Sequence, residues 1–95
     1  MTGIENVRSR IAEIDCEIIN LIAKRMDLAE DILESKKSDH ISINDVKQND
    51  VVLERAVNEA TEKGIDTAAL EDIFRILIQM NIERQHELSG EGNLP

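Results

Sequence analysis

The sequence predicts an all-α chain of three helices, the first of them long. Gly, Pro, Trp and Tyr are scarce or absent among the 95 residues, whereas Ile, Leu, Glu, Asp, Lys and Arg are abundant, a composition that favours helices over strands. Apolar residues recur at steps of three and four, the spacing of one helix face. A chain this short buries a thin core by itself, so a partner chain would help to stabilise it.

The first predicted helix runs from about residue 4 to residue 36 with no Gly or Pro inside it. Its seam is a narrow row of aliphatic residues: Ile4, Val7, Ile11, Ile14, Ile18, Leu21, Leu28 and Ile32. Such a helix is about 50 Å long, whereas a compact chain of this size spans about 32 Å. One copy cannot cover the seam, so we expect a homodimer in which the same helix of a second copy covers it.

A loop and a second helix follow. The helical period is lost over residues 37–44, where Ser, Asp, His and Asn gather. Asp45 is the expected N-cap of the second helix, and Gln48 completes a capping box three residues later. Gly64 suits the position just past the end of this helix, because glycine readily adopts the left-handed conformation found there.

The third predicted helix begins after Asp66 or Thr67, either of which would cap it. It carries one apolar face as far as Leu88. We expect a single helical domain over residues 1–88, followed by a flexible C-terminal tail over residues 89–95.

Composition disfavours several classes of function. A net charge of −9 argues against binding nucleic acid or an anionic membrane surface. A single cysteine, Cys16, excludes an internal disulfide framework, and two histidines cannot supply a zinc spacing. No export signal and no apolar stretch near ~18 residues is present, so we expect a cytoplasmic protein that needs no metal.

Cationic side chains interrupt the first helix where a core is expected. Arg25 fills the seam step between Leu21 and Leu28, and a charge left buried and unpaired costs roughly 3 to 5 kcal/mol. Arg25 therefore extends to solvent, pairs with a core glutamate or faces a cavity. Lys36 lies about 20° around the helix and ~16 Å further along, so it either leans toward the same pocket or is a solvated lysine at the helix end.

Two amides interrupt the third helix in the same way. Asn81 and Gln85 lie four residues apart on the apolar face, as a structural hydrogen-bonded pair or as the wall of a cavity. A cavity with two cations and two amides suits a small anionic ligand. Arg8 points about 100° away from Arg25, so it is a surface arginine or serves the pocket of a second copy. No Ser or Cys has a His placed to activate it as a nucleophile.

An ordered set of short segments runs without a gap from about Val7 to Gln85. It comprises Val7-Arg8-x-x-Ile11-x-x-Ile14-Asp15-x-x-Ile18, Ile22-Ala23-Lys24-Arg25-Met26-x-Leu28-Ala29, Lys36, Ile43-x-Asp45, Gly64-Ile65-Asp66, Ile73-Phe74 and Asn81-x-x-x-Gln85. This set resembles the all-helical chorismate mutase family. The resemblance implies an intertwined homodimer of three-helix chains. It also implies the intramolecular Claisen rearrangement of chorismate to prephenate, in phenylalanine and tyrosine biosynthesis, without metal or cofactor.

The resemblance also implies roles for individual residues. Arg25 matches the arginine that binds a substrate carboxylate in its own subunit, and Arg8 matches the arginine donated to the partner's site. Lys36 and Gln85 match the pair that hydrogen-bonds the ether oxygen of the substrate. Lys36, Gln85 and Arg25 are thus the expected catalytic residues.

Four further positions are expected to bind substrate. Asp45 matches the acidic residue near the ring hydroxyl, and Asn81 stands where a small polar residue assists carboxylate binding. Gln48 and Asn49 replace the usual Arg-Glu of the family, which removes one cation and one carboxylate from the expected pocket. Gln48 still has hydrogen bonds to donate, and Asn49 has an oxygen that accepts from a hydroxyl.

Three alternative functions stay open at this point. An isochorismate pyruvate-lyase and a mutase for 4-amino-4-deoxychorismate would use a similar helical scaffold and cationic pocket. A non-catalytic helical dimerisation module would share the seam but have no use for the polar residues inside it.

Overall fold

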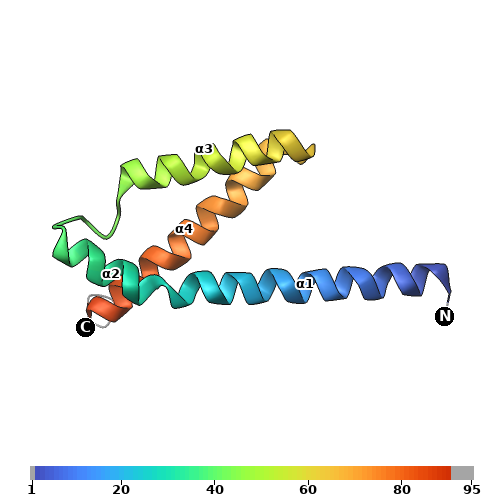
Figure 1. Cartoon of the computed structure of the whole chain (residues 1–95), viewed down its shortest axis with the longest axis horizontal. Coiled ribbons are helices and arrows are strands. Elements are labelled where there is room, and N and C mark those ends of the chain that lie inside the picture. The colour runs from blue at the N-terminus through green and yellow to red at the C-terminus, as the bar shows by residue number, and fades with distance from the viewer. Residues whose placement is uncertain (1, 91–95) are drawn as a thin grey trace.

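A computed structural model describes residues 2–90 of the chain and confirms the all-α class. The described residues form helices and their connections, with no strand among them (Figure 1). The helices are α1 (Gly3–Asp27), α2 (Ala29–Ser38), α3 (Val46–Lys63) and α4 (Thr67–Ser89). None of the helices in this part of the chain is long and apolar enough to cross a membrane.

The predicted first helix is interrupted, so the expectation of one continuous helix to residue 36 was wrong. α1 ends before Leu28, and α2 starts after it. The side chain of Asn81 donates from Nδ2 to the carbonyl oxygen of Arg25 at 3.3 Å. A regular helix would use that oxygen for the N–H of Ala29, and a side chain that inserts into this ladder bends or breaks a helix. Packing against α4 thus divides the helix.

Local capping sets the bounds of α3 and α4 as the sequence predicts. Asp45 Oδ1 accepts from the N–H of Gln48 at 3.3 Å, and Asp66 Oδ1 accepts from the N–H of Ala69 at 3.0 Å. Gly64 closes α3 in the left-handed conformation, with a φ of 68°. The chain therefore reverses between α3 and α4 without strain.

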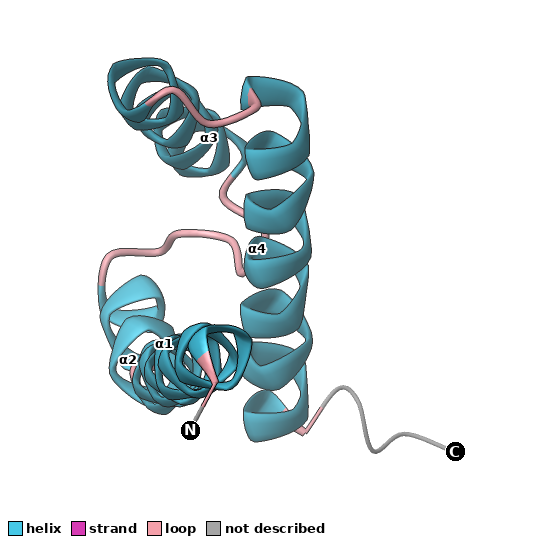
Figure 2. Cartoon of the chain, turned by 90° about the vertical axis from the view of Figure 1, so that its right-hand side faces the viewer, coloured by secondary structure: helices cyan, strands magenta, loops and turns pink. Residues whose placement is uncertain are grey.

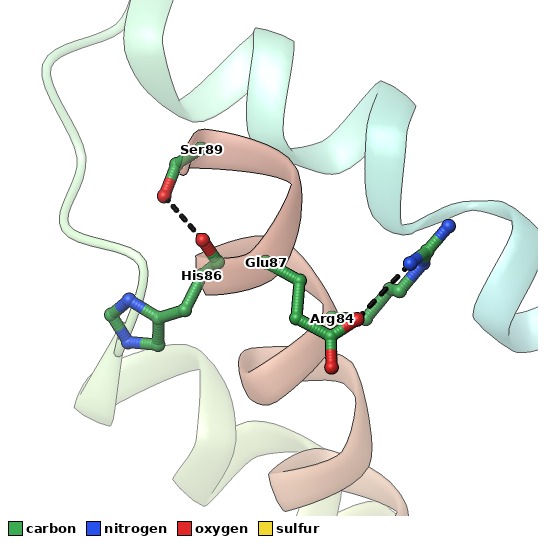
Figure 3. A network of polar contacts seen from close by, with 4 residues as sticks. All are labelled: Arg84, His86, Glu87 and Ser89. Carbon is green, nitrogen blue, oxygen red and sulfur yellow. Dashed lines mark hydrogen bonds and ion pairs between the residues drawn. The ribbon is translucent and has the colours of Figure 1, made fainter. Parts of the chain in front are cut away.

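The last turns of α4 carry their own contacts and extend past the predicted end of the domain. Arg84 Nη1 lies 3.1 Å from Glu87 Oε2, and the Ser89 hydroxyl donates to the His86 carbonyl at 2.8 Å (Figure 3). Gly90 then ends the helix with a φ of 89°. Residues 91–95 of the predicted tail, like Met1, lie outside the described residues.

α4 is the helix against which the others pack. α3 lies beside its first half, and the α1–α2 junction crosses its second half on the same side (Figure 2). The apolar residues that become buried are few, and half of them are alanine: Ala29, Leu33, Val52, Leu53, Ala56 and Ala60. The core of one copy is therefore as thin as the chain length predicts.

α1 projects from the rest of the chain and contains no buried residue (Figure 1). The chain measures 55 × 29 × 23 Å, and its radius of gyration of 16.9 Å exceeds the ~12 Å of a compact chain of this length. The eight seam residues, from Ile4 to Ile32, remain 44–62% exposed. This confirms that one copy of the chain does not cover its own seam.

Candidate active site

A cavity of about 240 Å³ opens where α2, the start of α3 and the second half of α4 meet. Its aliphatic wall consists of Leu28, Ile32, Val52, Ile78 and Ile82. Its polar residues are Arg25, Lys36, Asp45, Gln48, Asn49, Asn81 and Gln85. All predicted site residues except Arg8 thus line one cavity, although they come from four separate helices and a loop.

Arg25 occupies the last turn of α1, partly buried at the cavity wall. Its Nη1 donates to the backbone carbonyl of Leu77 at 3.1 Å, and no carboxylate of the described residues forms an ion pair with it. Burial lowers the pKa of Arg25, and the positive charge of Arg55 lowers it further. Of the three alternatives for Arg25, the structure supports the cavity, where the guanidinium keeps donors for an anion.

Lys36 lies in the last turn of α2 and lines the same cavity. Its Nζ donates to the carbonyl oxygen of Ile43 at 2.5 Å, which holds the ammonium group against the loop that leads to α3. Burial lowers the pKa of Lys36, while the carboxylate of Asp45 partly offsets this by raising it. Lys36 is therefore a cavity residue as well as a helix-end lysine.

Asn81 and Gln85 form the hydrogen-bonded pair that their spacing suggested, and they form it in the cavity wall. Gln85 Nε2 donates to Asn81 Oδ1 at 2.5 Å. Gln85 is only 2% exposed, and its Oε1 is buried without a hydrogen-bond partner in the described part of the chain. These amides are thus both a structural hydrogen-bonded pair and part of the cavity wall.

The start of α3 supplies the remaining polar lining. Asp45 uses one carboxylate oxygen to cap the helix and still faces the cavity. Gln48 lies in the lining and is exposed, and its side chain does not bond to the Asp45 N–H, so the predicted capping box was wrong although Asp45 is the N-cap. Asn49 donates from Nδ2 to Asn44 Oδ1 at 2.8 Å, so its amide is held at the rim of the cavity.

Arg8 is the one predicted site residue that the structure keeps away from the cavity. It lies almost five helical turns before Arg25, roughly 25 Å along α1 at ~1.5 Å per residue. Its side chain is exposed. This agrees with the prediction that Arg8 does not serve the pocket of its own subunit.

The backbone acceptors of the two cations are features that sequence analysis missed. The carbonyls of Leu77 and Ile43 hold Arg25 and Lys36, and no residue type marks such a carbonyl in a sequence.

No group of three or more His, Cys, Asp or Glu within residues 2–90 is arranged to hold a metal ion.

Comparison with known proteins shows which family the chain belongs to. The family model for chorismate mutase type II matches residues 7–86. A chorismate mutase of Methanocaldococcus jannaschii is 36% identical over 85 residues, which cover 90% of this chain and 86% of that protein. Two bifunctional chorismate mutase/prephenate dehydratases match at 31% identity over 81 residues in Buchnera aphidicola and 24% over 82 residues in Enterobacter agglomerans. These matches cover 85% and 86% of this chain but only 21% of each bifunctional relative. A family match across this much of its length shows that the chain belongs to the chorismate mutase type II family.

Proposed function

We propose that this protein is a chorismate mutase, an isomerase that converts chorismate to prephenate by an intramolecular Claisen rearrangement. The observation that carries the proposal is the convergence of Arg25, Lys36 and Gln85 on one cavity with aliphatic walls. Membership of the family and the chorismate mutase activity named for the Methanocaldococcus relative support it. We expect the protein to act in the cytoplasm, where thiols are kept reduced and a free cysteine such as Cys16 is common.

The reaction requires neither proton transfer nor a covalent intermediate. The protein therefore has two tasks, to position the substrate and to stabilise the charge that develops on it. The aliphatic walls and the cations would hold the enolpyruvyl side chain over the ring in a near-attack geometry. Lys36 and the second N–H of Gln85 would then meet the negative charge that grows on the ether oxygen as its bond to the ring breaks. Donors that are already fixed by Ile43 and Asn81 need little reorganisation at that moment.

The charge of the cavity supports a second copy of the chain as part of the site. One copy contributes the positive charges of Arg25 and Lys36 and the negative charge of Asp45. Chorismate carries two carboxylates, so one copy leaves the substrate incompletely neutralised. Arg8 of a second copy would supply the missing cation, and the exposed α1 would carry it there.

The exposed seam of α1 supports the dimer that this arrangement needs. Six aliphatic side chains, from Ile4 to Leu21, line one face of α1 and are left bare by their own chain, and burying such area contributes about 25 cal/mol per Å² before the entropic cost of association. We therefore propose an intertwined homodimer in which the two α1 helices pair along their seams, as closed two-fold dimers commonly do.

Truncation of one seam residue tests this dimer. The Ile14→Ala change is expected to raise the dissociation constant of the dimer by about 10- to 100-fold, because each dimer loses two buried side chains. Sedimentation velocity across a dilution series measures this. Ile65→Ala, at the turn between α3 and α4 and 48% exposed, is the matched control and should leave the constant unchanged. Equal dissociation constants for Ile14→Ala and the wild type would contradict the proposed interface.

The pH dependence of turnover tests the role of Lys36. Because burial lowers the pKa of Lys36, its proton is lost at a lower pH than that of an ordinary lysine, and kcat/KM should fall as pH rises through that value. A bound dianion favours the charged lysine, so kcat should hold to higher pH than kcat/KM. Initial rates between about pH 6 and pH 11 measure both. Lys36→Arg keeps the charge throughout this range, so an alkaline fall that persists in this variant would rule out Lys36 as its cause.

Incubation of purified protein with chorismate and a chelator tests the proposed function itself. Loss of chorismate with stoichiometric appearance of prephenate is the expected result. Pyruvate release from isochorismate, with little prephenate formed from chorismate, would replace the mutase by a lyase. Inertness toward both substrates would leave a mutase for 4-amino-4-deoxychorismate and the non-catalytic dimerisation module.

A further inference from the structure

Asn81 joins two parts of the cavity wall through its side-chain amide. Nδ2 donates to the backbone carbonyl of Arg25 at 3.3 Å, and Oδ1 accepts from Gln85 Nε2 at 2.5 Å. Arg25 returns a bond to α4, from Nη1 to the Leu77 carbonyl at 3.1 Å. These contacts tie the end of α1 to the second half of α4 at the cavity.

The contacts of Asn81 have a fixed direction. A backbone carbonyl can only accept a hydrogen bond, so the Arg25 carbonyl draws the NH₂ group of Asn81 toward itself. The oxygen of Asn81 must then face Gln85. The Arg25 carbonyl lies at the interruption of the helix, where it accepts from Asn81.

The direction of the Asn81 amide decides the direction of the Gln85 amide. A primary amide presents either N–H donors or an oxygen acceptor to the same point when it turns by 180°. Gln85 Oε1 has no partner within residues 2–90, so no contact of that oxygen holds the group. Gln85 Nε2 bonds to Asn81 Oδ1, and this bond selects the orientation that keeps the NH₂ group on the side of Asn81.

We propose that Asn81 is a positioning residue, which turns the NH₂ group of Gln85 toward the ether oxygen and takes its own direction from the Arg25 carbonyl. The inference rests on the proposed mutase function. It gives Asn81 a role beyond the carboxylate contact that family resemblance implies, because the oxygen and one N–H of its amide are engaged within the protein and only the second N–H is left for a substrate.

A double-mutant cycle with Gln85 tests this role. Asn81→Ala is expected to lower kcat by about 10- to 100-fold, since misplacing a catalytic group by about 1 Å costs up to that much, while KM changes by less than about 3-fold. When Gln85 is already alanine, the same change should lower kcat by less than about 2-fold, because nothing is left to position. Equal losses in both backgrounds, or a loss confined to KM, would overturn the inference.

Two further variants keep the cycle interpretable. Gln79→Ala removes an exposed amide of the same helix that bonds to Glu83, and its kcat should stay within about 2-fold of wild type. Asn81→Ser keeps a small polar group that is too short to reach both the Arg25 carbonyl and Gln85. If the alanine variant does not fold, Asn81→Ser replaces it in the double-mutant cycle.

A spectroscopic readout separates this inference from the proposed function. The side-chain amide signals of Gln85 in a ¹H–¹⁵N spectrum of the unliganded dimer, assigned through their loss in Gln85→Ala, should shift in Asn81→Ala and stay in place in Gln79→Ala. Unshifted signals in Asn81→Ala would overturn the positioning contact. A wild-type protein without chorismate turnover would overturn the function and the role toward the ether oxygen, whereas additive losses in an active wild type would overturn the positioning role alone.

Discussion

Replacing Lys36 by alanine is expected to lower kcat by about 10²- to 10³-fold, equivalent to about 3 to 4 kcal/mol of lost transition-state stabilisation. The ammonium group lies in the cavity wall, where burial lowers its pKa and the Ile43 carbonyl fixes its position. In the proposed mechanism this cation meets the negative charge that grows on the ether oxygen as its bond breaks. Steady-state rates at saturating chorismate measure the effect.

The loss should be catalytic rather than structural. Lys36 is partly exposed at the end of α2, so its removal leaves the core intact, and circular dichroism and gel filtration should match wild type. Lys37→Ala is the matched control, because Lys37 is the next residue, carries the same charge and is exposed outside the cavity lining. A Lys36→Ala protein that keeps more than about a tenth of the wild-type kcat would remove Lys36 from the mechanism.

Replacing Arg8 by alanine is expected to lower kcat/KM by about 10²-fold, through loss of a charge-assisted contact to a substrate carboxylate. The effect is informative because Arg8 lies roughly 25 Å from the cavity of its own chain and is exposed there. A surface arginine in that position would have no influence on turnover.

Arg10→Ala is the control for this change, because Arg10 is exposed on the same helix and points to another side of it. Its kcat/KM should stay within about 2-fold of wild type. If Arg8→Ala and Arg10→Ala both left kcat/KM unchanged, the proposed donation of Arg8 to a second copy would be wrong.

The ends of α3 and α4 could be predicted from the sequence because capping is local. Asp45 and Asp66 each bond to an N–H three residues away, and the left-handed Gly64 needs no distant partner. The presence of Arg25, Lys36, Asn81 and Gln85 in the cavity could be predicted for a related reason, whereas Asp45, Gln48 and Asn49 were expected there only from the family resemblance. A polar residue such as Arg25 or Gln85 on an apolar helix face would be buried with the core, so it needs a polar partner or a cavity however the helices pack.

The break at Leu28 could not be predicted because its cause is distant in the sequence. No Gly or Pro marks it, and Asn81, which takes the Arg25 carbonyl, lies 56 positions beyond that residue. Neither the direction of the Asn81 amide nor the carbonyl that holds Lys36 leaves a signal in residue types, since both depend on how the helices pack.

The α1 seam is left uncovered by its own chain. Periodicity and length together predict that the seam is too long for one chain, and the isolated chain leaves Ile14 54% exposed and Leu21 62% exposed. The proposed pairing of the seams is therefore a property of two copies together, and the proposed delivery of Arg8 to a second copy rests on it.

Mixing two inactive variants tests most directly whether each site is shared between two copies. Arg8→Ala and Lys36→Ala chains, co-expressed with different affinity tags and purified as mixed dimers, should recover about half of the wild-type turnover per dimer, because one of the two sites keeps both residues. The other site lacks both. If Arg8 served the cavity of its own chain, every site of the mixed dimer would lack one residue, and turnover no higher than that of the two parent variants would contradict the account.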